Sequence, residues 1–263
     1  MADLKSKLIN NFSPNMLKTF DECQRKFLFK YIQRLALPQR STIFEKGKKV
    51  HALANYYLKG ENIEKMEKVL TPDEKIAWES LKSNKYFQLQ AVNTEYNLSC
   101  KVDNYWVGGR LDALMSEEQK GKSEKRYGRI DVWTYGMAET DNQAKKPFIH
   151  TSNLPAFLSP YVILDYKTGN IPQNAQADFQ TIVYLLCADR FLNKKGGYES
   201  LKFVYLGLKN NTEKEILLNE TLKKQYEEKI VSTCKKIDFA INSNVFPKNN
   251  EACKYCEYFK ICN

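Results

Sequence analysis

The amino-acid sequence predicts an α/β domain built on a mixed β-sheet with helices on its faces. The first reason is the order of the patterns: helical spacing of apolar residues comes first, strand-like alternation follows, and a further helix and further strands come later. The second reason is a short apolar run at Tyr161–Leu164, which is typical of a central strand covered on both faces. With 263 residues, 13% of them aromatic, the chain can fill the core of one large domain.

The first third of the chain is predicted to be helical. Ser13 and Pro14 indicate a helix start, because Ser favours the N-cap and Pro the first turn, and the apolar spacing continues to about Ile32. A second helix is predicted at Thr42–Leu58, and it carries His51. A third helix is predicted from about Pro72 to Lys82.

Short strands and an insertion follow these helices. Antiparallel strands are predicted at Thr94–Leu98, Tyr105–Val107 and Arg110–Met115. Residues 116–160 are polar or lack periodicity, so we expect an insertion there, with one more strand at Arg129–Tyr135. The later predictions are a helix at residues 176–193, strands at Leu201–Leu208 and Glu215–Leu218, a helix at Asn219–Asn242 and a cysteine-rich tail at residues 245–263. We therefore expect one domain over residues 1–263, with an insertion and a tail.

The charge balance favours a polyanionic partner. The chain has 41 Lys and Arg against 31 Asp and Glu, a formal charge of +10, although a basic soluble protein without such a partner would also show this excess. No apolar run is long enough to cross a bilayer, and the N-terminus lacks the features of a signal peptide. We therefore expect a cytoplasmic protein that does not use a membrane.

Asp165 and Lys167 form the most informative pair in the sequence. They lie two residues apart on a predicted strand, so both side chains leave the same face, and the apolar run before them implies burial. Burying these charges is costly unless they are paired or bound to a metal. A structural salt bridge is the simpler explanation of this pair taken alone.

Other polar residues extend the pair to a possible site. Asp112 interrupts an apolar alternation, Gln180 and Tyr184 share one helix face, and His51 lies in the middle of a helix. Taken singly, each is also explained as an ordinary surface or core residue. Together, two carboxylates and an imidazole suit Mg or Mn, and the cation would activate water. Lys167 could handle the proton or offset charge on a phosphate. Gln180 and Tyr184 could bind the phosphate or a nucleotide.

The order of these motifs resembles the RecB-like branch of the PD-(D/E)XK nuclease superfamily. The motifs that carry the resemblance are the opening Phe12-Ser13-Pro14 with Cys23, then His51, then Gly109-Arg110-Leu111-Asp112, then Ile163-Leu164-Asp165-Tyr166-Lys167-Thr168-Gly169, and then Gln180-x-x-x-Tyr184. The resemblance implies a restriction-endonuclease-like core and a metal-dependent DNA nuclease. It implies His51, Asp112, Asp165 and the backbone carbonyl of Tyr166 as metal ligands, with Lys167 in catalysis.

Three questions stay open at this point. Asp131, in a second Gly-Arg-x-Asp motif, is an alternative to Asp112 as the first acid. The expected activity is that of an exonuclease on single-stranded or frayed DNA ends, with Tyr166 or Tyr184 available to stack on bases; the alternative is a non-catalytic DNA-binding or scaffolding subunit. The Gly-x4-Gly-Lys-Ser/Thr motif of ATP-binding loops is absent, so any unwinding would come from a helicase or a CRISPR-adaptation partner.

Cysteines cluster at the end of the chain. Cys253, Cys256 and Cys262 lie within ten residues, and the expected compartment disfavours disulfides. Three thiols need a fourth ligand for a tetrahedral metal, and Cys23 is the natural candidate. CRISPR-associated RecB-like exonucleases and the AddB subunit hold a 4Fe-4S cluster with one early and three late cysteines, so the resemblance implies that cluster here, joining the N-terminal helices to the tail; zinc is the alternative. The remaining thiols are expected to be small buried residues: Cys100, Cys187 and Cys234.

Overall fold

A computed structural model describes residues 9–36, 42–117 and 158–262. Five strands form one sheet in chain order: β1 (Gln90–Val102), β2 (Tyr105–Ser116), β3 (Tyr161–Lys167), β4 (Leu201–Gly207) and β5 (Thr212–Leu217). Strands β3 and β4 are parallel and are joined through helix α7 (Phe179–Lys194), while the other neighbouring pairs are antiparallel. The sheet is therefore mixed, which confirms the predicted α/β class.

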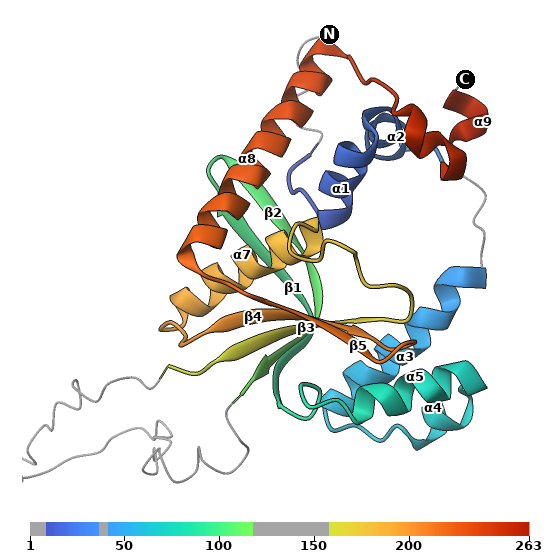
Figure 1. Ribbon diagram of the computed structural model, residues 1–263, viewed down its shortest axis with the longest axis vertical. Coiled ribbons are helices and arrows are strands. Elements are labelled where there is room, and N and C mark those ends of the chain that lie inside the picture. Colours follow the sequence, from blue (N-terminus) through green and yellow to red (C-terminus); the bar gives the residue numbers. More distant parts are fainter. Residues whose placement is uncertain (1–8, 37–41, 118–157, 263) are drawn as a thin grey trace, which may run out of the picture.

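Helices cover both faces of this sheet. In Figure 1, α7 and the long helix α8 (Glu220–Ser243) lie on the upper side, and α3 (Thr42–Leu58), α4 (Glu64–Lys68) and α5 (Pro72–Lys82) lie on the lower side. Alternate residues of β3 divide between the two cores: Ile163 packs with the α7 side, and Val162 and Leu164 pack with the α3 side. This two-sided burial explains why Tyr161–Leu164 reads as a continuous apolar run.

The N-terminal helix is shorter than predicted. Helix α1 (Pro14–Glu22) begins at the Ser13 cap, but Cys23 is extended (φ −161°, ψ 112°), and α2 (Gln24–Phe27) and a π-helical turn at Leu28–Ile32 follow it. The break frees the Arg25 N–H, which donates to the Pro247 carbonyl of the C-terminal segment at 3.1 Å. A tertiary hydrogen bond therefore replaces one that a continuous helix would make.

The prediction of three short strands before the insertion was wrong in detail. Residues 90–116 form one long hairpin, because Gly108 and Gly109 continue β2 and pair with Ser99 and Leu98. A Cβ on Gly108 would lie 2.5 Å from the Leu98 carbonyl oxygen. Close packing, rather than a turn, thus explains this glycine pair.

The remaining predictions agree with the structure, differ at one end, or lie outside it. Helix α7 begins at Phe179 instead of residue 176, and β5 begins at Thr212 instead of Glu215. Helices α3 and α5 have the predicted bounds, and Thr71 and Glu74 form a capping box at the start of α5. Short helix α4 was not predicted; Glu67 in it accepts a hydrogen bond of 2.6 Å from Trp78, which is a tertiary contact. The predicted strand Arg129–Tyr135 lies outside the described residues, as does most of the insertion, which joins neighbouring strands β2 and β3.

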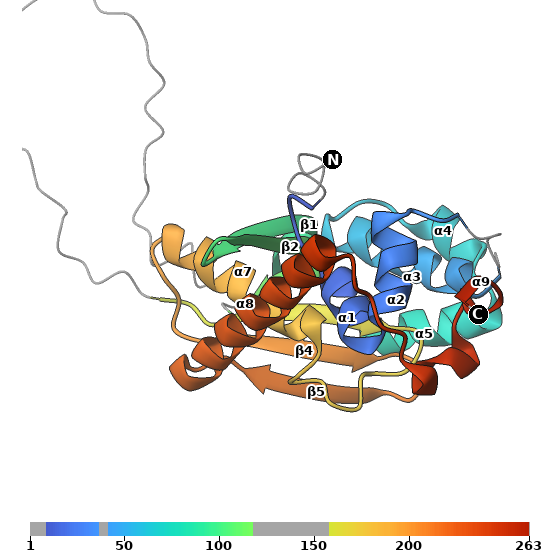
Figure 2. The ribbon, with the colours of Figure 1, turned by 90° about the horizontal axis from the view of Figure 1, so that it is seen from above.

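The C-terminal tail lies beside the N-terminal helices. The tail forms a 3-10 helix at Asn250–Tyr255 and a last turn, α9 (Phe259–Cys262). Figures 1 and 2 show this segment next to α2, and the Asn249 side-chain amide donates to the Glu22 carbonyl at 3.0 Å. Within the described ranges, every helix is too short or too polar to span a membrane.

Candidate active site

The candidate site forms where strands β2 and β3 separate. Their ladder runs from Ser116–Tyr161 to Ala113–Leu164 and stops there. Beyond it, the Asp112 side chain stands between the strands, and its Oδ2 accepts a hydrogen bond of 3.1 Å from the Tyr166 backbone N–H. The Asp112 side chain thus takes the place of the next backbone hydrogen bond between β2 and β3, and the two strands separate beside Asp165.

The Tyr166 backbone also faces this opening. Its N–H points to Asp112, and the N–H and C=O of one strand residue leave the same edge. The next carbonyl, that of Lys167, points the other way and accepts from the Leu208 N–H on the β4 side at 2.9 Å. The Tyr166 carbonyl oxygen is therefore directed to the same side as Asp112.

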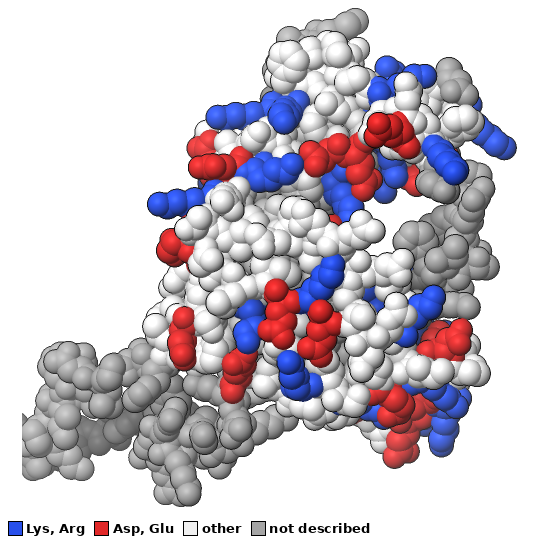
Figure 3. Space-filling view, in the orientation of Figure 1, with Lys and Arg blue, Asp and Glu red and all other residues white. Residues whose placement is uncertain are grey.

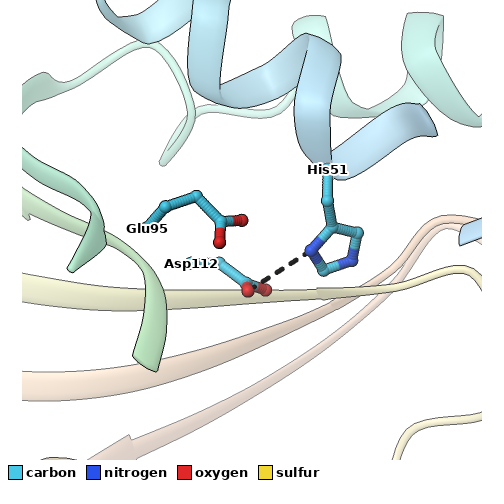
Figure 4. A group of neighbouring side chains, drawn as sticks. All are labelled: His51, Glu95 and Asp112. Atoms are coloured by element: carbon cyan, nitrogen blue, oxygen red, sulfur yellow. Dashed lines mark ion pairs between the residues drawn. The ribbon is translucent and has the colours of Figure 1, made fainter. Parts of the chain in front are cut away.

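His51 reaches the site from α3. Its Nδ1 lies 3.3 Å from Asp112 Oδ1 (Figure 4). Its ring packs against the Tyr166 ring at 4.7 Å between centroids. Burial alone would lower the pKa of His51, but the hydrogen bond and charge of Asp112, with Asp165 and Glu95, raise it overall. One turn earlier, a Cβ on Gly47 would lie 3.0 Å from Thr168 Oγ1, so glycine lets α3 approach the end of β3.

Asp165 and Lys167 share a face of β3, as predicted, and Gln180 joins them. The Lys167 Nζ lies 2.8 Å from Asp165 Oδ2 and donates to Gln180 Oε1 at 2.9 Å. The Gln180 amide nitrogen donates to Asp165 Oδ1, which closes the triangle. Asp178 caps α7 by accepting from the Gln180 N–H at 2.9 Å, so the helix start fixes this side chain.

The surroundings of Asp165 disfavour its ionised form. Its side chain is 2% exposed, and burial, followed by the charge of Asp112, raises its pKa to about 6, while Lys167 opposes the shift. Its Oδ2 has the Lys167 ion pair but accepts no hydrogen bond within the described part of the chain. A buried carboxylate oxygen left in this state is suited to a cation.

Tyr184 lies beside the site rather than in it. Its hydroxyl donates to the Arg110 backbone carbonyl at 2.7 Å, and its ring lies against Gly109, where a Cβ would come within 3.0 Å. Tyr184 therefore holds β2 two residues before Asp112. The expectation of base stacking is corrected for both tyrosines, because Tyr184 is buried and Tyr166 is fully buried between His51 and Phe87.

Glu95 is the site residue that the sequence analysis missed. One ligand atom each from His51, Glu95 and Asp112 lies within 4.8 Å of the others, and Figure 4 shows both carboxylates to the left of the imidazole. The missed signal was the hairpin turn at Asp103-Asn104. A two-residue turn fixes the register of the strands that it joins, and this register places residue 95 opposite residue 112.

Asp131, the alternative first acid, lies outside the described residues. The structure brings together the other residues predicted for the metal and catalytic roles: His51, Asp112, Asp165, Tyr166, Lys167 and Gln180, with Tyr184 adjoining them. Carboxylate oxygens, a backbone carbonyl and an imidazole form a donor set that suits Mg²⁺ or Mn²⁺.

The four cysteines of the predicted cluster line one cavity. Cys23, Cys253, Cys256 and Cys262 surround a volume of ≈ 160 Å³ between the N-terminal helices and the tail. Burial and the other three thiols raise the pKa of Cys262. Within the described ranges, His51, Glu95 and Asp112 are the one set of three ligating side chains whose ligand atoms all lie within 4.8 Å of one another. No three of the four cysteine sulfur atoms are within 4.8 Å of one another.

Comparison with known proteins places the chain in a family. The sequence model of the family described as "PD-(D/E)XK nuclease superfamily" matches residues 11–132 and 159–263. A solved structure from Eubacterium rectale, described as a candidate exonuclease, superposes with a TM-score of 0.52 at 11% sequence identity, covering 96% of this chain and 88% of that one. The structure of SSO0001 gives a TM-score of 0.45 at 16% identity, with 96% and 85% coverage. A search of curated proteins finds no match. The family match spans most of the chain, including the residues of the candidate site, and the chain belongs to the PD-(D/E)XK nuclease superfamily.

Proposed function

We propose that this protein is a divalent-metal-dependent DNA exonuclease that acts on single-stranded or frayed ends. One observation carries the proposal: Asp112 and Asp165 flank the opening between β2 and β3, with Lys167 paired to Asp165 at 2.8 Å. The chain belongs to a nuclease superfamily, which supports this assignment. The roles of the site residues, the mode of attack and the kind of DNA are all part of the proposal.

Asp112, Asp165, His51 and the Tyr166 carbonyl would hold Mg²⁺ or Mn²⁺. When bound, the cation supplies Lewis acidity toward a phosphate oxygen and lowers the pKa of a water. The buried Asp165 carboxylate fits this role, since its pKa rises to about 6 when no cation offsets the cost of its burial.

Lys167 orients the hydrolytic water and offsets negative charge on the phosphate. Its side chain is 29% exposed, so its ammonium reaches the opening while Asp165 and Gln180 hold it in place. A fixed donor stabilises developing charge without reorganisation, which is the main contribution of such groups. Gln180 acts as a positioning residue for this pair.

The DNA partner is supported by charge. The net charge is +10, and Figure 3 shows Lys and Arg interspersed with Asp and Glu on the face in view. Lys and Arg side chains would contact the phosphates of the DNA. Binding should then be independent of sequence and sensitive to salt.

The test is degradation of end-labelled single-stranded DNA with Mg²⁺ or Mn²⁺, beside a circular single strand of the same length. An exonuclease degrades the linear strand and spares the circle. Asp165→Ala and Lys167→Ala should abolish cleavage, while Asp73→Ala, an exposed acid on α5, should retain it. Full activity of Asp165→Ala would overturn the site, cleavage of the circle would overturn the exonuclease mode, and binding without cleavage by the wild type would favour a scaffolding subunit.

We also propose that the four-cysteine cavity holds a 4Fe-4S cluster. The four thiols share one cavity, and four thiolates are the ligand set of such a cluster. Zinc accepts the same four ligands and is the alternative. The cluster would join Cys23 to the tail across most of the chain.

The spectrum of anaerobically purified protein tests this assignment. Iron and sulfide with broad visible absorption support the cluster, and a colourless protein with one zinc overturns it. Cys256→Ser should lose the metal and melt at a lower temperature. Cys234→Ala is the matched control, because Cys234 is a buried thiol of α8 outside the cavity.

Duplex DNA should require a separate unwinding partner, either a helicase or a protein of a CRISPR-adaptation complex. The chain contains no ATP-binding loop motif. Blunt duplex DNA should therefore resist the protein alone and be degraded once a helicase and ATP are added. Rapid degradation of blunt duplex by the protein alone would contradict this proposal.

A further inference from the structure

Glu95 faces Asp112 across the β1–β2 hairpin. Thr94 pairs with Ala113 and Tyr96 with Leu111, so residues 95 and 112 lie directly opposite each other. Their carboxylates and the His51 imidazole each offer a ligand atom within 4.8 Å of the other two. Glu95 therefore points at the cation site from the side opposite to Asp165's strand.

The backbone at Glu95 is held in a conformation that non-glycine residues avoid. Its φ is +47°. Tyr96 packs against Phe191 of α7, whereas Thr94 hydrogen-bonds Asn55 of α3 at 2.7 Å, so residues two apart face opposite sides of the sheet. Regular strands do not allow this. The irregularity turns Glu95 toward His51, and strain of this kind gathers at functional sites.

Arg110 balances the charge of Glu95. Its Nε lies 2.8 Å from Glu95 Oε2, and the arginine side chain is 65% exposed while that of Glu95 is 19% exposed. Each acid of the site thus has its own partner, since Asp112 has His51 and Asp165 has Lys167. A divalent cation and a guanidinium would compete for the same carboxylate oxygens.

We propose that Glu95 is a further ligand of the divalent cation, and that Arg110 leaves Glu95 when the cation binds and then contacts a phosphate of the DNA strand. The inference rests on the proposed function of the same site. An exposed arginine can turn away from β2 at little cost, and its planar fork matches a phosphate well. An ordinary cross-strand ion pair would need neither the left-handed backbone nor the approach to His51.

Mn²⁺ binding to the DNA-free protein tests the role of Glu95, with titration calorimetry as the readout. Glu95→Gln should bind Mn²⁺ about tenfold more weakly or worse, and Glu95→Asp should recover part of the loss. Glu228→Gln, an exposed acid on α8, is the matched control and should bind as the wild type does. Thermal unfolding without metal confirms that each variant is folded.

Two results would overturn the inference in distinguishable ways. If Glu95→Gln binds Mn²⁺ as the wild type does while Asp112→Asn does not, Glu95 is no ligand and the proposed function stands. If Asp112→Asn and Asp165→Asn also bind Mn²⁺ normally, the cation site itself is misplaced and the proposed function fails with it.

Arg110→Gln tests the exchange. Without Arg110 to compete for the Glu95 carboxylate, the variant should bind Mn²⁺ severalfold more tightly. It should bind single-stranded DNA more weakly, measured with Ca²⁺ to prevent cleavage, and the salt dependence of DNA binding should show one fewer phosphate contact. Lys101→Gln, an exposed cation on β1, controls for net charge. Weaker Mn²⁺ binding by Arg110→Gln would show that the pair supports the site structurally, and would overturn the exchange.

Discussion

Replacement of Asp165 by asparagine should remove a loss of stability that the metal-free protein suffers as the pH rises, although it also removes a residue of the candidate site. Asp165 is almost fully buried and lies beside Asp112. Burial and that second charge raise its pKa from the usual 3.8 to about 6, and Lys167 offsets only part of the effect. The folded protein therefore keeps a proton on Asp165 at pH values where the unfolded chain has lost it.

The magnitude follows from the two pKa values. The difference between 3.8 and about 6 corresponds to roughly 3 kcal/mol. Between these values the folded state binds more protons than the unfolded state, so this group makes the wild type less stable as the pH rises, and the loss is complete above about pH 6. Asparagine does not titrate. The unfolding free energy of Asp165→Asn, relative to that of the wild type, should thus increase by roughly 3 kcal/mol between acid and neutral pH.

Urea unfolding followed by circular dichroism, with a chelator present and at a series of pH values, measures this difference. Carboxylates that do not interact with Asp165 titrate alike in both proteins and cancel in the comparison. Adding Mn²⁺ should stabilise the wild type and leave the variant unchanged, because bound ligand favours the state that holds it. A difference that stays constant with pH, or that turns toward the wild type as the pH rises, would refute the reasoning.

Three further predictions concern neighbouring parts of the molecule. Tyr184→Phe removes the hydroxyl that donates to the Arg110 carbonyl, so it should lower the unfolding free energy by about 1–3 kcal/mol. It should also slow cleavage while calorimetry shows an unchanged Mn²⁺ affinity. Unchanged cleavage would show that Tyr184 does not position the site. Glu74→Gln should cost about 1 kcal/mol at neutral pH, because it removes the charge that accepts from the Thr71 backbone N–H and pairs with Lys49. Burial opposes ionisation of Glu74, but hydrogen bonds from Thr71 and the charge of Lys49 outweigh it and lower the Glu74 pKa. The stability that this carboxylate contributes is therefore present above pH 4.5 and is lost on acidification; a cost of Glu74→Gln that persists in acid would contradict this account. The affinity for single-stranded DNA should fall linearly with salt on logarithmic axes, and a flat response would exclude phosphate contacts as its source.

Local signals predicted most elements well. The Thr71-Pro72 cap, the apolar spacing of Thr42–Leu58 and the buried run before Asp165 are properties of neighbouring residues, and the observed bounds follow them. The break at Cys23 was not predictable in this way, since the N–H that it frees bonds a carbonyl more than 200 residues away.

The sequence by itself determined which chemistry is available: two acids, an imidazole and a lysine, with Asp165 and Lys167 on one face because strands repeat every two residues. Only the tertiary structure decided that β2 and β3 part at Asp112, that Glu95 turns toward His51, and that Tyr184 holds a backbone instead of a base. The periodicity of a strand or helix depends on residues close in the chain. The separation of strands and the approach of a helix depend on many weak contacts between residues far apart in the chain, and these contacts cannot be predicted from any short stretch of sequence.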